Sequence, residues 1–315
     1  MTKLSIFKRN PNKIKQRPSE AIFGAAVMVS LVILMIFFIY PFYNCIVLSF
    51  NDGRDATREG LFFLPRVFTM DNYSRALRAE GFGMAAVMSV LRTGIATTLS
   101  VMVCSMFGYA MSKNHLRFRK LYMTLAMIPM FFSGGMIPSF LLIRNIGLYN
   151  NFLVYILPGL FSMFYAIIFM GSFREIPASL EESAMLDGAN HVTLFYRIIL
   201  PVSKPVIAAI SIFTAVGHWN SWMDTMLYTR KEGLNTLAYL FSKVIFSAQY
   251  LQSLVESNEG GSGGGAAQIA AEMRGATSTS IMVAAMVLAT VPITLIYPFF
   301  QKHFTKGVMI GSIKG

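Results

Sequence analysis

The chain reads PASLEESAMLDGA over residues 177–189 and IILP over residues 198–201. Ser179 and Glu182 have the spacing of a capping box, in which a hydroxyl and a carboxylate satisfy free amides of the first helical turn. Gly188 falls where a helix ends in a left-handed residue. Pro201 blocks further helix, because its nitrogen carries no hydrogen. The segment therefore predicts a short helix, a sharp elbow and a second short helix.

Long apolar stretches flank this segment. Of the 315 residues, 55% are hydrophobic and 13% are charged, whereas soluble domains carry about 25% charged residues. The net charge of +12 would suit nucleic acid, but the apolar fraction is too high for a dissolved basic protein. Basic residues beside apolar spans instead set membrane topology. Cys45 and Cys104 offer no disulfide framework and no metal-ligand spacing. The composition predicts an integral membrane protein.

A helix that crosses a bilayer needs about 20 apolar residues. The apolar run that begins at Ala21 is longer than that of a signal peptide, so we interpret it as a retained helix. The charge-free run 93–112 extends back past Arg92 toward Met84. We predict an all-α membrane protein with six transmembrane helices, within residues 21–43, 84–112, 121–143, 145–173, 205–223 and 275–301.

The basic residues predict the orientation of these helices. An even number of spans puts both termini on one side. With the basic N-terminus in the cytosol, the inside holds 16 of the 27 basic residues, and the outside loops are close to neutral. This asymmetry predicts that both termini and residues 174–204 are cytosolic.

The same reading divides the chain into segments. Within the extracytoplasmic loop 51–83, Thr69 or Asp71 predicts a helix start. The run GGSGGG at residues 260–265 has the composition of a flexible linker, and no Lys-Ser/Thr follows it as in a phosphate loop. We predict a cytosolic N-terminus (1–20), a first transmembrane helix (21–50), the loop 51–83, a core (84–301) with an extracytoplasmic glycine-rich loop (229–274), and a cytosolic tail (302–315).

The segment quoted first also carries a family resemblance. Glu182-Ser183-Ala184, followed by Gly188 and by Leu200-Pro201, resembles the "EAA" loop of binding-protein-dependent ABC importer permeases, with Ser183 where the family usually has alanine. The resemblance extends from residue 84 to residue 300. It is closest to the carbohydrate branch, and within that branch to the maltose-transporter-like second permease subunit and to permeases for complex oligosaccharides such as fragments of plant cell-wall polysaccharides. Other similar stretches are FTMDNY at 68–73, WNSW at 219–222, YPFFQK at 297–302 and KGVMIG at 306–311.

This resemblance implies a type I importer permease fold with a cytosolic coupling helix, in a bacterial inner membrane. It implies a second homologous permease, two ATPase subunits and an extracytoplasmic sugar-binding protein as partners, and no nucleic acid. The chain itself would be non-catalytic and would bind no metal or cofactor, with ATP and magnesium on the ATPase. The residues that would dock to the ATPase are Glu181, Glu182, Ser183, Ala184, Asp187, Gly188, Leu200 and Pro201.

A polar stripe is predicted at the end of the fifth span. On a continuous helix, residues 217, 220, 221, 224 and 228 share one face. One interpretation is a sugar pathway lined by Asn220, Ser221, Asp224 and Tyr228 with Trp219 and Trp222. The other is that the polar residues bind neighbouring helices and the tryptophans form an interfacial belt.

Two further alternatives stay open. Arg92 lies inside a span, where a charge suggests function, yet it is close enough to the outer end to reach the headgroups. The rival class is a secondary transporter or another polytopic membrane protein that does not use ATP. A secondary transporter usually shows ionisable residues near the bilayer midplane and broken helices in paired halves, and the sequence shows neither.

Overall fold

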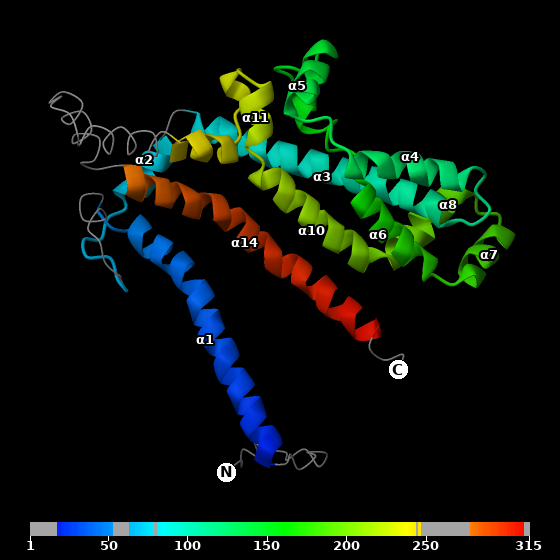
Figure 1. The fold of residues 1–315 in the computed structure, drawn as a ribbon, viewed down its shortest axis with the longest axis horizontal. Coiled ribbons are helices and arrows are strands. Elements are labelled where there is room, and N and C mark those ends of the chain that lie inside the picture. The colour runs from blue at the N-terminus through cyan, green and yellow to red at the C-terminus, as the bar shows by residue number, and fades with distance from the viewer. Residues whose placement is uncertain (1–17, 53–62, 79–80, 244, 247–277, 312–315) are drawn as a thin grey trace, which may run out of the picture.

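A computed structural model describes residues 18–52, 63–78, 81–243, 245–246 and 278–311 (Figure 1). In this part of the chain every regular element is a helix, and the β interaction found is an isolated bridge between Asn51 and Phe68. The labelled helices are α1 (Pro18–Ser49), α2 (Asp71–Arg78), α3 (Phe82–Ser112), α4 (Arg119–Phe131), α5 (Met136–Asn145), α6 (Met163–Arg174), α7 (Ala178–Leu186), α8 (His191–Leu194), α9 (Leu200–Val202), α10 (Lys204–Asn220), α11 (Met223–Tyr228) and α14 (Ser278–Gly311). Residues 237–243 are helical as well. Short 3-10 helices cover Phe152–Tyr155 and Glu232–Leu234, and a π-helical turn covers Phe195–Ile199.

The centre of the fold is α3, which packs against α6 and α10. Gly108 permits a close approach of α3 to α6. A Cβ at this position would lie 2.7 Å from the Cβ of Phe169 and 2.9 Å from the carbonyl oxygen of Ala166. Helix backbones approach this closely only where the side chain between them is very small.

The end of α1 is tied to α2 by polar contacts. The side-chain amide of Asn72 donates to the carbonyls of Ser49 (3.0 Å) and Asn51 (2.8 Å). The hydroxyl of Thr69 accepts the amide of Asp71 at 3.1 Å, which confirms the helix start predicted here. Figure 1 shows α1 meeting α14 near α2 and diverging from it toward its N-terminal end.

The predicted third span is not one straight helix. The chain leaves α4 after Phe131 and enters α5 at Met136 with a bend of 116°. Two consecutive glycines cause the break, because Gly135 has a φ of +85° that side-chain-bearing residues rarely adopt. Figure 1 shows α5 projecting away from the bundle formed by α3, α6 and α10.

The predicted fourth span is interrupted as well. Residues 145–173 form a turn, the 3-10 helix Phe152–Tyr155, an irregular stretch and then α6. Gly147 and Asn150 have left-handed backbones at φ +77° and +58°, and Pro158-Gly159 follows them. These residues end regular helix before a full span is complete.

In the described part of the chain, two helical stretches are long and apolar enough to cross a membrane, Ile22–Ser49 and Phe82–Ser112. The number rises to four if each of two bent pairs counts as one span. One pair is α4 with α5. The other runs from His191 to Asn220 with a bend of 83°. The structure therefore contains bent helix pairs that the sequence did not show, whereas an arrangement of broken helices in paired halves is not tested by them. The predicted run 260–265 lies outside the described residues.

Candidate functional site

Two regions carry the residues singled out in the sequence. The first is the knob, defined as residues 178–202, which contains α7, α8, the π-helical turn and α9. Its first helix begins at Ala178 after Pro177, and no side chain caps it. The predicted capping box of Ser179 and Glu182 is wrong. Ser179 already lies inside the first turn, so its hydroxyl is not in the capping position.

The end of α7 matches the sequence prediction. Gly188 has a φ of +82°. Its amide donates to the carbonyl of Met185 at 3.0 Å, and the amide of Ala189 donates to the carbonyl of Ala184 at 2.9 Å. This pair of hydrogen bonds is the Schellman motif, which closes a helix on a left-handed residue. The elbow of the knob is therefore fixed by backbone hydrogen bonds.

The second half of the knob is helical, as predicted, but Pro201 does not stop it. The side chain of Asn190 accepts the amide of Thr193 at 2.8 Å and so caps α8. The chain then widens into the π-helical turn, in which the amide of Leu200 donates to the carbonyl of Phe195. Pro201 has no amide hydrogen to donate. It fits into α9 because the π-helical turn before it shifts the backbone hydrogen bonds, so that no amide donor is required at residue 201. The bend comes at Ser203 instead.

One side of the knob is buried in the bundle. Ala184, Leu194, Phe195 and Ile199 join a hydrophobic cluster with residues of α3, α6 and α10. The opposite side is exposed and carries apolar residues, with Leu186 90% and Val192 63% exposed. Of the predicted docking residues, Ala184 is buried and Glu181 and Leu200 are half-buried. The exposed ones are Glu182, Ser183, Asp187, Gly188 and Pro201.

An ion pair joins the knob to α3. The ammonium of Lys113, the residue that follows α3, pairs with the carboxylate of Glu181 in α7. The two side chains are 17% and 14% exposed. The same ammonium lies 4.6 Å from the centre of the Tyr109 ring. Little water reaches this pair, so it is screened less than a surface pair.

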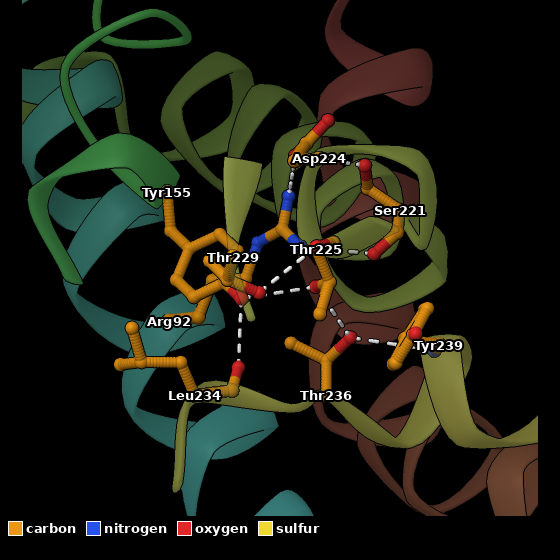
Figure 2. A network of polar contacts seen from close by, with 9 residues as sticks. All are labelled: Arg92, Tyr155, Ser221, Asp224, Thr225, Thr229, Leu234, Thr236 and Tyr239. Atoms are coloured by element: carbon orange, nitrogen blue, oxygen red, sulfur yellow. Dashed lines mark hydrogen bonds and ion pairs between the residues drawn. The ribbon is translucent and has the colours of Figure 1, made fainter. Parts of the chain in front are cut away.

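The second region is the arginine cluster shown in Figure 2. It comprises Arg92, Tyr155, Ser221, Asp224, Thr225, Thr229, Leu234, Thr236 and Tyr239. Arg92 of α3 is 1% exposed. One terminal nitrogen of its guanidinium donates to the carbonyl of Ser221 at 2.9 Å, and the other pairs with the carboxylate of Asp224. The guanidinium carbon lies 4.6 Å from the centre of the Tyr155 ring. Arg92 therefore does not reach toward headgroups, because its charge is satisfied inside the protein.

Threonines and backbone groups complete the arginine cluster (Figure 2). The hydroxyl of Tyr155 donates to the carbonyl of Leu234 at 2.7 Å and lies 3.0 Å from Oγ1 of Thr225. Oγ1 of Thr225 in turn lies 3.1 Å from Oγ1 of Thr236. The arginine cluster thus joins α3 and α11 to the two 3-10 helices, Phe152–Tyr155 and Glu232–Leu234.

The predicted polar stripe is not the face of one helix. Asn220 ends α10, and Ser221 has an extended backbone (φ −75°, ψ 115°), so α11 starts in a new direction. Ser221 and Asp224 still lie together, because the Ser221 hydroxyl donates to the Asp224 carboxylate at 2.9 Å. Asn220, which directly precedes Ser221, is exposed.

The aromatic residues of the stripe have separate neighbours. Nε1 of Trp219 donates to the carbonyl of Ala289 in α14 at 3.0 Å. Trp222 lies edge-on to Phe246 at 5.2 Å, and Tyr228 stacks on Phe140 of α5 at 6.2 Å. Each ring therefore packs against a neighbouring helical segment, and its place in a sugar pathway stays a prediction. Sequence reasoning missed the contacts of Tyr155 and Lys113, because nothing in the neighbouring sequence distinguishes either residue.

Known proteins resemble the chain over nearly its whole length. Residues 115–310 match the family model described as "Binding-protein-dependent transport system inner membrane component". The chain is 34% identical over 294 residues to the polygalacturonan/rhamnogalacturonan transport system permease protein YtcP of Bacillus subtilis, covering 93% of this chain and 97% of that protein. It is 34% identical over 277 residues to Protein LplC of the same organism, covering 88% and 90%. A chain in the crystal structure of a bacterial ABC transporter involved in the import of the acidic polysaccharide alginate superimposes with a TM-score of 0.78 at 27% identity, covering 92% and 99%.

Proposed function

This chain belongs to the family of binding-protein-dependent transport system inner membrane components, and we propose that its cargo is an acidic oligosaccharide. It is a permease subunit of an ATP-driven sugar importer, in which a separate subunit hydrolyses ATP. Two of the similar proteins are named for polygalacturonan and for alginate, both polymers rich in uronic acids. That shared chemistry supports a cargo of short uronate-containing chains, such as fragments of plant polysaccharides.

The knob is the part that we assign to ATPase coupling. The observation that carries this assignment is the elbow at Gly188, where two backbone hydrogen bonds fix a short helix against the bundle. The exposed side presents Leu186 and Val192 together with Glu182 and Asp187. Exposed apolar residues rimmed by charges are typical of a surface that another protein covers. A rigid, capped helix also passes on rigid-body motion of a partner.

We further propose that the chain crosses the membrane six times with both termini and the knob in the cytosol, the bent pair of α4 and α5 forming one span and α10 another. The Lys113–Glu181 ion pair supports this orientation, because it joins two loops that the basic residues predict on the same side. Figure 1 also shows α7 at the end of α3 that lies away from α2 and from the start of α14.

The partners follow from the same proposal. They are a second, homologous permease, two ATPase subunits and an extracytoplasmic sugar-binding protein. The chain needs no metal or cofactor of its own, since ATP and magnesium would bind the ATPase. For the cargo pathway we propose Asn220, which ends α10 with an exposed amide. Ser221 and Asp224 would shape the pathway beside it through their contacts with Arg92.

Affinity purification tests the assembly. The tagged chain, extracted from native membranes in mild detergent, should bring down an ATPase subunit and a different permease in stoichiometric amounts. Recovery of the chain alone would favour a transporter that does not use ATP.

Uptake by whole cells tests the cargo. Cells that lack the chain should lose uptake of short galacturonate oligomers and keep uptake of neutral glucose oligomers of equal length. Equal loss of both, or loss of neither, would contradict the acidic cargo.

A further inference from the structure

An ion pair lies at each end of an uninterrupted stretch of α3. The helix contains no proline and runs without a break from Phe82 to Ser112. Arg92 and Lys113 are 21 residues apart, which corresponds to about 32 Å at about 1.5 Å per residue. The hydrocarbon core of a bilayer is about 30 Å thick. The two ion pairs are therefore separated by about one membrane thickness along one helix.

The knob ion pair, Lys113 with Glu181, fastens α3 to α7. It is an addition to contacts that already hold the knob in place. Ala184, Leu194 and Phe195 are buried against the bundle in a hydrophobic cluster. A nearly buried ion pair costs desolvation energy and is weak evidence for stability on its own. It adds a direct contact between α7 and the end of α3, so that a displacement of α7 also moves the end of α3.

The helix-break ion pair, Arg92 with Asp224, fastens α3 to the junction of α10 and α11. It is not the sole contact there, because α3 also packs against α10. Asn150 holds the chain after α11, because its amide donates to the carbonyl of Tyr228 at 2.9 Å and its side-chain oxygen accepts the amide of Arg230 at 2.5 Å. Arg92 instead binds the break between α10 and α11 itself. It donates to the carbonyl of Ser221 and pairs with the carboxylate of Asp224.

We propose that α3 transmits movement of the knob to the break between α10 and α11, with Lys113 and Arg92 as positioning residues at its two ends. The inference rests on the proposed function, in which the ATPase moves the knob. It goes beyond that function by naming the helix and the two contacts that carry the movement. Within this path the two contacts act in series, so loss of either one removes the contribution of α3, while α10 still joins the knob to the break along the chain.

A double-mutant cycle on the complete importer tests this series arrangement. The variants are Glu181→Gln, Asp224→Asn and both together, which remove charge and keep the shape of the side chain. The control is Asp71→Asn, which removes an exposed ion pair with Arg75 in α2. Each importer is reconstituted in proteoliposomes with its binding protein and galacturonate oligomers. The measured quantity is the number of sugars transported per ATP hydrolysed.

We expect each single variant to lower this ratio by about fivefold or more, the usual scale of coupling between sites. The double variant should be no worse than the poorer single variant, whereas distant independent sites have additive free energies and so multiply their effects. Multiplied losses, or unchanged ratios in the single variants, would overturn the inference. Asp71→Asn should match the wild type, and a similar fall in its ratio would also overturn it.

The result stays decisive if Asp224→Asn does not assemble. Arg92→Lys then replaces Asp224→Asn in the cycle. Lysine keeps the positive charge but cannot bind Ser221 and Asp224 through two separate guanidinium nitrogens. Its ratio should fall, again without adding to the loss in Glu181→Gln, and an unchanged ratio counts against the inference. A wild-type importer that hydrolyses ATP without moving sugar would contradict the proposed function itself. A working wild type with insensitive variants contradicts the role of α3 alone.

Discussion

Replacement of Gly188 by valine separates a structural elbow from an ordinary loop. Gly188 has a φ of +82°, and a Cβ built there would meet nothing within 4 Å. The cost of a side chain is therefore backbone strain and not a clash. A left-handed residue costs an L-amino acid about 1–2 kcal/mol, and a β-branched residue is a clear outlier there. An energy of this size changes a population about 5- to 30-fold.

The assay compares Gly188→Val with Gly188→Asn, because asparagine adopts the left-handed conformation more readily. Binding of the ATPase at limiting concentration and sugar-stimulated ATP hydrolysis should fall about 5- to 30-fold in the valine variant. The asparagine variant should keep most of both, and membrane insertion should persist in each. Normal coupling in Gly188→Val would refute the elbow. Equal damage by asparagine would show that the surface at residue 188 matters, not its backbone.

Three other predictions concern topology, packing and cargo. In a cysteine-free background, a membrane-impermeant maleimide added to intact cells should label Met226→Cys and leave Met185→Cys untouched, although both methionines are exposed (55% and 41%); labelling of residue 185 would invert the orientation. Gly108→Ala should cost about 1–3 kcal/mol by forcing α3 away from α6 and lower the thermal midpoint in detergent, whereas Gly94→Ala in the same helix, with nothing within 4 Å of its Cβ, should not. Asn220→Ala should reduce uptake while assembly with the ATPase persists; normal uptake would remove Asn220 from the pathway.

Local features of the fold were predictable where one residue determines the backbone. Gly188 has the conformation expected of it, since only glycine adopts a positive φ without strain. The start of α2 at Asp71 also matches its signal. The apolar runs of α1 and α3 gave their helices directly. In each case the information lies within a few neighbouring residues.

The errors arose where hydropathy outweighed local backbone signals. Residues 145–173 contain no charged residue, but Gly147 and Asn150 turn the chain before α6 can begin. The prediction of one polar stripe near residue 221 required a continuous helix, but the extended backbone of Ser221 interrupts that helix.

The pairing of Arg92 with Asp224 joins residues far apart in the chain. No periodicity in a single sequence reports such a contact. The sequence showed only that Arg92 is a charged residue inside a predicted span. The same holds for Lys113 and Glu181, whose contact depends on how the knob folds back on α3.

Reconstituted transport tests the central claim most directly. Proteoliposomes would contain either this chain alone or the chain with its partner permease and ATPase, supplied with binding protein and labelled galacturonate oligomers. We predict uptake in the complete assembly that requires ATP, and none by the chain alone with ATP or with an imposed proton or sodium gradient. Sugar uptake by the single polypeptide, driven by an ion gradient, would contradict its role as one subunit of an ATP-driven importer.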